Sequence, residues 1–184
     1  MKVDLRKSLF ILPNLFTLSS VLCGYYASLI LSDRSTSDDF YRAALLIIFA
    51  LFFDGIDGRV ARLTKTQSAI GVQLDSLADV ISFGVAPAIL VYYWSLSELG
   101  TAGMLVGFLF VAAGAIRLAR FNVMATSDDG QPHQPGKYMQ GLPIPAAAGI
   151  LISIVVANTL TGKLPFTPII ISALVLMLAL FMVS

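Results

Sequence analysis

The sequence contains few charged residues. Asp, Glu, Lys and Arg make up only 12% of its 184 positions, whereas about a quarter is usual for soluble domains. Hydrophobic residues account for 57% of the chain, and the mean hydropathy is +0.85. So little polar surface excludes an ordinary soluble fold. The composition predicts an integral membrane protein that forms a single domain over residues 1–184.

Cysteine, histidine and net charge are also scarce, with one Cys, one His and a net charge of +1. A lone cysteine excludes an internal disulfide framework, and Cys23 lies in an apolar stretch where a buried thiol is expected. His133 falls in a polar loop and is not expected to be catalytic. A charge balance near zero gives no reason to expect a nucleic-acid partner.

The N-terminal residues bear a superficial likeness to a secretory signal, because Lys2, Arg6 and Lys7 precede an apolar run. The run from Leu9 to Leu31 is too long for a signal peptide, and no convincing cleavage site follows it. We therefore expect this run to be a retained first helix.

Six apolar segments are long enough to cross a bilayer, which takes about 20 helical residues. Lipid offers the backbone no hydrogen-bond partners, so each segment is expected to be a helix; none alternates as barrel strands do. The predicted fold is an all-α bundle of six transmembrane helices, at approximately Pro13–Ser32, Tyr41–Leu63, Val72–Leu96, Gly100–Val123, Leu142–Thr161 and Phe166–Val183.

Lysine and arginine are distributed unevenly between the two sides of the predicted membrane. The N-terminus and the second-to-third and fourth-to-fifth connections carry nine of them, whereas the opposite side carries only Arg34, Arg42 and Lys163. Positive charge gathers on the cytoplasmic side. We therefore expect a multi-pass protein of the cytoplasmic membrane with both termini in the cytoplasm. Residues 92–94 predict an aromatic belt at the far interface.

Four carboxylates lie at the edges of the second and third apolar segments: Asp54, Asp57, Asp75 and Asp79. The spacings of three and four residues place each pair on one face of a helix. Because the two helices are antiparallel neighbours, their cytoplasmic ends can bring the pairs together. An ionisable residue in a membrane segment is by default a functional candidate, so this cluster is the predicted site.

Oxygen ligands in this number favour Mg²⁺, Mn²⁺ or Ca²⁺ over zinc. Without metal, four clustered carboxylates would repel one another, and some would be protonated. Two divalent cations would neutralise the cluster, and paired metals can clamp the attacking and leaving oxygens of a phosphoryl transfer. The simpler alternative, that the acids only cap helix ends, explains one or two of them.

The acids are accompanied by small residues. Gly55, Gly58 and Ala61 leave one face of the helix end without bulk, where a phosphorylated ligand can approach the backbone. Arg62 projects from the same end, and its guanidinium suits phosphate oxygens. Gly71 gives the turn into the third helix conformational freedom.

The run from Asp54 to Asp79 resembles the signature of the CDP-alcohol phosphotransferases, D-x2-D-G-x2-A-R-x8-G-x3-D-x3-D, and matches every fixed position. The resemblance implies a homodimeric membrane enzyme that transfers a phosphatidyl-type group from a CDP-linked lipid to an alcohol and releases CMP. It implies that Asp54, Asp57 and Asp75 hold two metal ions. Asp79 would ligate a metal and also take the proton from the attacking hydroxyl.

The same resemblance assigns the donor nucleotide to Gly58, Ala61 and Arg62. Near the cytoplasmic end of the first helix, Pro13, Asn14 and Thr17 resemble a family pattern and are predicted to line the nucleotide pocket. A helix start with a polar cap is the alternative interpretation of these three residues.

Three further stretches resemble the phosphatidylserine synthase branch of the family: ISFGVAPA after Asp79, RLARFN from Arg117 and GLPIPAAA from Gly141. This branch implies CDP-diacylglycerol, or an ether-lipid analogue, as donor and the hydroxyl of L-serine as acceptor. The products would be phosphatidylserine, or its ether-lipid counterpart, and CMP.

Four residues outside the signature are predicted to meet the acceptor or a phosphate. Arg117 and Arg120 are one helical turn apart on the side of the carboxylates, which favours an anion site over two interfacial anchors. Asn122 follows them. Ser82 lies three residues beyond Asp79 and is predicted to orient the acceptor.

Two alternatives stay open from the sequence. The same chemistry on glycerol phosphate or an inositol compound would need further cationic residues, and only Arg117, Arg120 and Lys137 are available. A divalent-cation transporter would place its acids near the bilayer midplane. The acids here lie near one face, next to Arg59 and Arg62, which would repel cations.

Overall fold

The computed structural model describes residues 5–64, 69–125, 141–162 and 167–184, and over these residues it contains helices and no strand. The predicted all-α fold class is therefore confirmed. The elements are α1 (Leu5–Ile30), α2 (Ser37–Thr64), α3 (Ala69–Asp79), a π-helical turn (Val80–Val85), α4 (Ala86–Trp94), a 3₁₀ turn (Leu96–Leu99), α5 (Thr101–Ala125), α6 (Ile144–Thr161) and α7 (Pro168–Val183).

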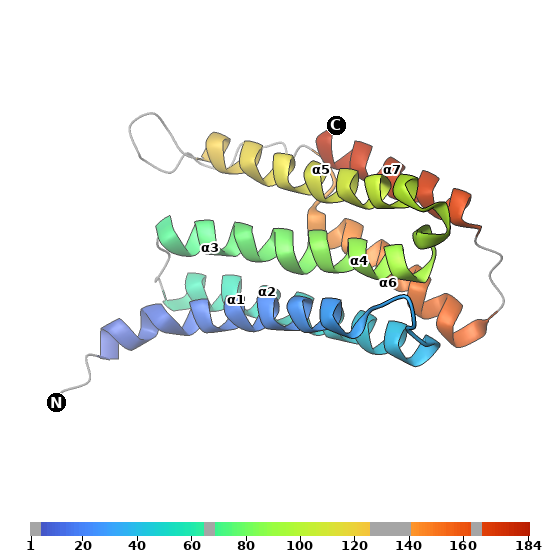
Figure 1. Cartoon of the computed structure of the whole chain (residues 1–184). Helices are drawn as coiled ribbons and strands as arrows, with labels where there is room; N and C mark the ends of the chain where they lie inside the picture. The colour runs from blue at the N-terminus through green and yellow to red at the C-terminus, as the bar shows by residue number, and fades with distance from the viewer. Residues whose placement is uncertain (1–4, 65–68, 126–140, 163–166) are drawn as a thin grey trace.

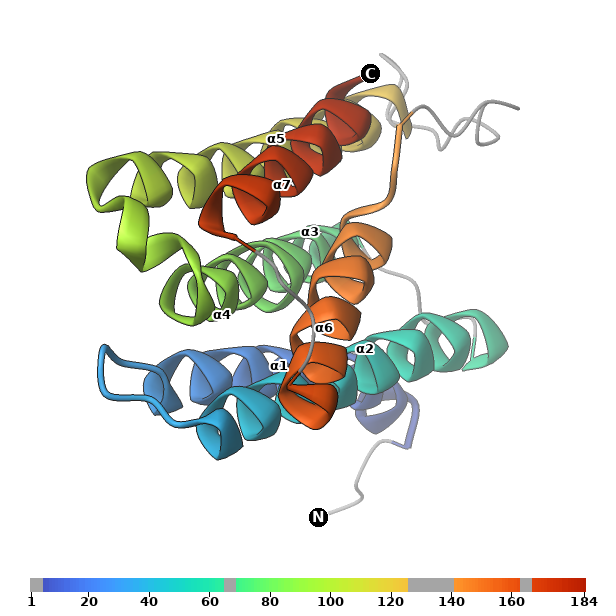
Figure 2. The same cartoon turned by 90° about the vertical axis from the view of Figure 1, so that its right-hand side faces the viewer.

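The helices form three layers, which Figure 1 and Figure 2 show from two sides. α1 and α2 make one antiparallel layer, α3 and α4 continue one another as a single rod in the middle, and α5 packs on α7 in the third. α6 runs steeply across these layers and contacts α2, α4 and the π-helical turn (Figure 2). The C-termini of α2 and α5 and the N-terminus of α3 lie at the same end of the bundle (Figure 1).

Local signals fix where two of the helices begin. In the first turn of α2, Asp39 Oδ2 accepts hydrogen bonds from the backbone N–H of Thr36 at 2.9 Å and from the Thr36 hydroxyl at 2.8 Å. These hydrogen bonds hold the pKa of Asp39 below its usual range. At α7, Thr167 caps the N–H of Ile170, and Pro168 occupies the first turn, where its missing N–H costs nothing.

Three helical stretches in the described part of the chain are long and apolar enough to cross a membrane, judged by length and composition: Ile70–Trp94, Thr101–Met124 and Ile144–Thr161. The first of these joins α3, the π-helical turn and α4, as the third predicted segment anticipated. α7 is apolar but has only 16 residues. α1 and α2 overlap the first two predicted segments but begin earlier, and α2 carries charged residues at both of its ends.

Ile144, at the start of α6, is fully buried where three elements meet. A Cβ atom added at Gly114 of α5 would overlap its Cδ1 atom, and one added at Gly84 of the π-helical turn would lie 3.4 Å from the same atom. The two glycines therefore let α6 reach both elements.

The segment before α6 is attached to the last turn of α7. The Leu142 N–H donates a hydrogen bond to the Phe181 carbonyl at 2.8 Å. Gly141 takes a φ of +80° here, and an added Cβ would lie 2.6 Å from the Met182 carbonyl oxygen. Only glycine combines this backbone conformation with so close an approach.

Candidate active site

The antiparallel arrangement of α2 and α3 brings carboxylates from both helices together at one end of the bundle. Asp54, Asp57 and Asp75 each offer an oxygen atom, and these atoms all lie within 4.8 Å of one another. Asp57 is buried, with 4% of its surface exposed, whereas Asp54 and Asp75 are partly accessible. We call these three residues the acidic cluster, and the end of the bundle that carries them the carboxylate end.

Asp79 lies beside the acidic cluster at the last position of α3. Its carboxylate lies close enough to that of Asp54 for their two negative charges to repel each other. Its Oδ1 atom is buried and has no hydrogen-bond partner among the described residues. A buried carboxylate oxygen without a partner is costly, so it is a natural ligand for a cation.

The donor set fits divalent cations. The acidic cluster supplies carboxylate oxygens from three residues, and small side-chain adjustments would let them reach a common ion. Asp79 adds a buried oxygen next to Asp54. Hard oxygen ligands of this kind suit Mg²⁺, Mn²⁺ or Ca²⁺, and no thiolate or imidazole contributes to the cluster in the described residues.

Thr17 of α1 is bonded to the acidic cluster. Its hydroxyl lies 2.6 Å from Asp57 Oδ2 and 3.2 Å from the carbonyl oxygen of Pro13, and it donates to these acceptors. Thr17 itself is buried. The sequence predicted a nucleotide contact for this residue, whereas the structure places its hydroxyl on a candidate metal ligand.

The small residues beside the acids of α2 face open space. An added Cβ at Gly55 or Gly58 would meet no atom within 4 Å, so the α2 surface beside Asp54 and Asp57 is accessible to a ligand. Arg62 is exposed on the last turn of α2. Asn14 is half-buried on α1, and the side chain of Ala61 lies outside the described residues.

The two arginines of α5 have different surroundings. Arg117 is half-buried, attracts the charge of Asp79, and has a buried Nε atom with no partner in the described ranges. Arg120 is exposed, and its Nη1 atom donates to the carbonyl oxygen of Val183 at 3.1 Å. A cation at the last carbonyls of α7 is favourable, which gives Arg120 a structural partner of its own. Arg117 is therefore the arginine that faces the carboxylates.

Asn122 and Ser82, also predicted to meet the acceptor, both contact other helices. The Asn122 amide donates to the Ser76 hydroxyl at 3.0 Å and so joins α5 to α3 next to Asp75. Ser82 is 0% exposed, and its hydroxyl pairs with that of Ser20 at 3.2 Å. In this structure Ser82 therefore makes a packing contact with α1, and its contact with the acceptor stays a prediction.

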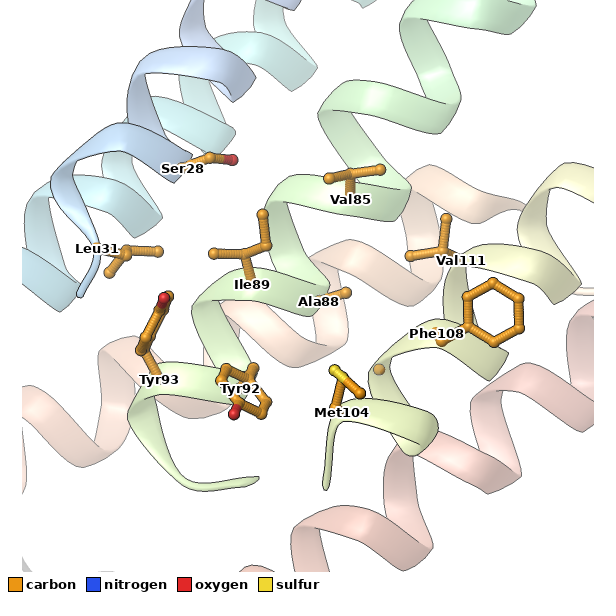
Figure 3. A pocket seen from close by; sticks show the side chains of 11 residues that line it. Ser28, Leu31, Val85, Ala88, Ile89, Tyr92, Tyr93, Met104, Phe108 and Val111 are labelled. Carbon is orange, nitrogen blue, oxygen red and sulfur yellow. The ribbon is translucent and has the colours of Figure 1, made fainter. Parts of the chain in front are cut away.

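An apolar cavity of about 370 Å³ lies at the opposite end of the bundle, between α1, α4 and α5. Figure 3 shows its lining, which includes Leu31, Ala88, Ile89 and Phe108, with the hydroxyls of Tyr92, Tyr93 and Ser28 nearby. No charged residue lines it among the described residues, and none of the predicted site residues does.

Sequence reasoning missed three residues near the site. Ser20 and Gly24 of α1 contact Ser82, and Ser76 binds Asn122. The only signal was spacing, because Thr17, Ser20 and Gly24 recur at intervals that share one helix face. His133 and Lys137, discussed above, lie outside the described residues.

Comparison with known proteins agrees with this geometry. The chain is 46% identical over 148 residues to the CDP-diacylglycerol–serine O-phosphatidyltransferase of Helicobacter pylori, which covers 78% of this chain and 56% of that protein. It is 36% identical over 157 residues to the Mycobacterium tuberculosis protein of the same name, covering 85% and 52%. It is 41% identical over 143 residues to the archaetidylserine synthase of Methanothermobacter thermautotrophicus, covering 77% and 56%.

The chain spans about half the length of the curated relatives it matches. The model of the CDP-alcohol phosphatidyltransferase family matches residues 10–183, which include every carboxylate of the site. Because this match covers nearly all of the sequence, the chain belongs to the CDP-alcohol phosphatidyltransferase family.

Proposed function

We propose that this protein transfers a phosphatidyl group from a CDP-linked lipid to the hydroxyl of L-serine, giving phosphatidylserine and CMP. The observation that carries the proposal is the convergence of Asp54, Asp57 and Asp75 from two helices, with oxygen atoms within 4.8 Å of one another. The family signature that the run from Asp54 to Asp79 resembles includes these three residues, which supports the proposal. The printed names of the relatives support serine as the acceptor.

In the proposed reaction, the serine hydroxyl oxygen attacks the phosphorus on the lipid side of the donor pyrophosphate. A new O–P bond forms, the P–O bond to CMP breaks, and Asp79 accepts the hydroxyl proton. The residues that would hold two divalent cations are Asp54, Asp57, Asp75 and Asp79. The chemistry that such cations supply when bound is neutralisation of charge on the pyrophosphate and on departing CMP.

The donor nucleotide is proposed to lie over the open α2 surface at Gly55 and Gly58. Arg62, on the last turn of α2, is placed to meet phosphate oxygens, and Ala61 and Asn14 are proposed to border the nucleotide. Thr17 acts there through Asp57, because its hydroxyl is bonded to that carboxylate.

Arg117 is the proposed partner of the serine carboxylate. It is half-buried near Asp79, and its Nε atom is buried with no partner in the described residues, so a carboxylate there would satisfy it. Arg120 and Asn122 support this position by holding α5 to α7 and to α3. The acidic cluster would attract the serine ammonium group.

The proposed setting is the cytoplasmic membrane, with six spans and both termini and the acidic cluster on the cytoplasmic side. The excess of Lys and Arg at the carboxylate end supports this orientation. Three spans meet the criteria of length and hydropathy on their own, and α1, α2 and α7 would complete the six. A homodimer is proposed from family membership.

The test is CMP release by purified protein in detergent, with CDP-diacylglycerol and Mg²⁺ or Mn²⁺, comparing serine, glycerol 3-phosphate, inositol and no acceptor. We expect release that requires both serine and metal and that falls at least about a thousandfold in Asp79→Ala. An Asp38→Ala control, far from the cluster on the first turn of α2, should keep full activity.

Other outcomes would revise the proposal in defined ways. Release with glycerol 3-phosphate or inositol, but not serine, would keep the mechanism and overturn the acceptor. Release only with an ether-lipid donor would favour the activity that the name of the Methanothermobacter relative describes. Release that is independent of metal would overturn the role of the acidic cluster.

A further inference from the structure

The regular α-helix of the middle rod ends at Asp79, and the next six residues, Val80–Val85, form a π-helical turn. A π-helical turn holds one residue more than an α-helical turn. Because each residue of an α-helix advances about 100° around the axis, the side chains before and after the turn are offset by about that angle.

This offset separates two faces that would otherwise coincide. Ala86 lies seven residues after Asp79, and Leu90 lies eleven residues after it. In an uninterrupted α-helix, positions at these spacings share one face. Ala86 and Leu90 are buried in the apolar core, with 1% and 0% of their surfaces exposed. Without the π-helical turn, Asp79 would therefore lie on the same core-facing side of the rod as Ala86 and Leu90.

α1 packs directly against the backbone of the π-helical turn. A Cβ added at Gly24 would lie 2.8 Å from the Cα atom of Ser82, which is closer than real Cβ atoms approach. One turn earlier, the buried hydroxyls of Ser20 and Ser82 are hydrogen-bonded at 3.2 Å. Both contacts meet at Ser82, in the middle of the turn.

The same face of α1 also reaches the acidic cluster. Thr17, Ser20 and Gly24 follow one another at spacings of three and four, so they form one strip along the helix. Thr17 binds Asp57 of α2, and the other two contact Ser82. This strip of α1 therefore fixes the position of α2 relative to the rod of α3 and α4.

We propose that Ser20, Gly24 and Ser82 are positioning residues for the reaction: through the π-helical turn they fix the rotation of α3 that aims Asp79 at Asp54. This inference rests on the proposed function, because the orientation of Asp79 matters only if Asp79 takes part in the proposed reaction. None of the three residues needs to touch substrate for this role, and the complete burial of Ser82 agrees with that.

The experiment compares Gly24→Ala with Gly149→Ala in the full chain. Gly149 is a matched control, since it also lies within a helix and its added Cβ would meet nothing within 4 Å. We expect Gly24→Ala to lower kcat at least about tenfold with little change in KM for CDP-diacylglycerol, because a misplacement of about 1 Å can cost a hundredfold. Gly149→Ala should keep the wild-type kcat.

A second readout does not depend on turnover. Mn²⁺ is titrated while the thermal midpoint of each purified protein is followed, and Gly24→Ala should need several times more Mn²⁺ than wild type for half of the stabilisation. A purely structural role for Gly24 would lower the midpoint without metal but leave kcat and the Mn²⁺ requirement of the folded protein unchanged. That result would overturn the inference.

The double variant Ser20→Ala/Ser82→Ala decides the question if Gly24→Ala does not fold, because it removes atoms and creates no overlap. We expect it to lower kcat about threefold and to raise the Mn²⁺ requirement; wild-type values for both would overturn the inference. Wild-type protein is assayed alongside. If it releases no CMP with serine, the proposed function has failed, whereas active wild type with unaffected variants would mean that only the positioning role has failed.

Discussion

The two ends of the bundle are built in different ways. At the carboxylate end, polar side chains of different helices are hydrogen-bonded to each other: Thr17 binds Asp57, and Asn122 binds Ser76. At the opposite end, mostly apolar side chains between α1, α4 and α5 surround a cavity of about 370 Å³ (Figure 3). Hydrogen bonds depend on direction, whereas apolar contacts depend mainly on the area buried.

This difference suggests a division of roles between the two ends of the bundle. Displacing a directional contact should change catalysis more than stability, because the geometry of the carboxylates depends on it. Changing apolar volume at the cavity should change stability and leave catalysis alone. Each of the following predictions tests one side of this contrast.

Of the three substitutions that test this contrast, the largest effect is expected at Arg117. Arg117→Ala should lower kcat/KM for serine by about ten- to a hundredfold, the range expected when a charged hydrogen-bond partner is lost. Arg120→Ala is the matched control, because its guanidinium donates to the Val183 carbonyl instead. It should lower the thermal midpoint slightly and keep kcat/KM within about threefold. Initial rates over a range of serine concentrations give kcat/KM for both variants. Equal losses of kcat/KM in the two variants would contradict the assignment of Arg117.

An intermediate effect is expected at Thr17. Thr17→Val keeps the shape of the side chain but removes the hydroxyl that donates to Asp57 Oδ2. We expect roughly a tenfold fall in activity at limiting Mn²⁺, because groups that orient a metal ligand typically contribute ten- to a hundredfold to affinity. Saturating Mn²⁺ should recover much of the loss. Thr17→Ser, which keeps the hydroxyl, should behave as wild type, and a loss in Thr17→Ser as large as that in Thr17→Val would count against this role.

The smallest expected effect is at the cavity. Gly107 lines it from the interior of α5, and an added Cβ would lie 3.9 Å from Ala88, an ordinary contact distance. Gly107→Ala should stabilise the protein by about 0.5–1 kcal/mol, because glycine weakens a helix interior by that amount. Serine-dependent turnover should not change. A thermal melt and the CMP assay measure the two quantities, and altered turnover would mean that the two ends are coupled.

Much of the carboxylate end was predictable from the sequence. The spacing of the four aspartates gave the helix faces, and antiparallel neighbours with a short connection gave their convergence, which the structure bears out for Asp54, Asp57 and Asp75. The all-α fold followed from apolar runs that must satisfy their own backbone in lipid. Both features depend on the spacing of residues that are close together in the chain, and this spacing can be read directly from the sequence.

Other features depend on contacts between distant residues. The run VISFGV has no composition that distinguishes a π-helical turn from an α-helix, and its register depends on Gly24, far earlier in the chain. Similarly, Arg117 and Arg120 look alike in the sequence. They differ only because α7 ends beside Arg120. The spacing of three residues after Asp79 predicts an acceptor contact for Ser82, but it does not reveal the hydrogen bond of Ser82 with Ser20 of α1.

The packing of Ile144 against Gly114 and Gly84 restricts how sequences of this family can vary. One side chain fills the space that Gly114 and Gly84 leave on two other elements, so the volume there belongs to the three positions jointly. A larger residue at 114 is compatible with the fold only beside a smaller one at 144. In aligned sequences these positions should therefore co-vary in size, and a change at either one alone should be rare.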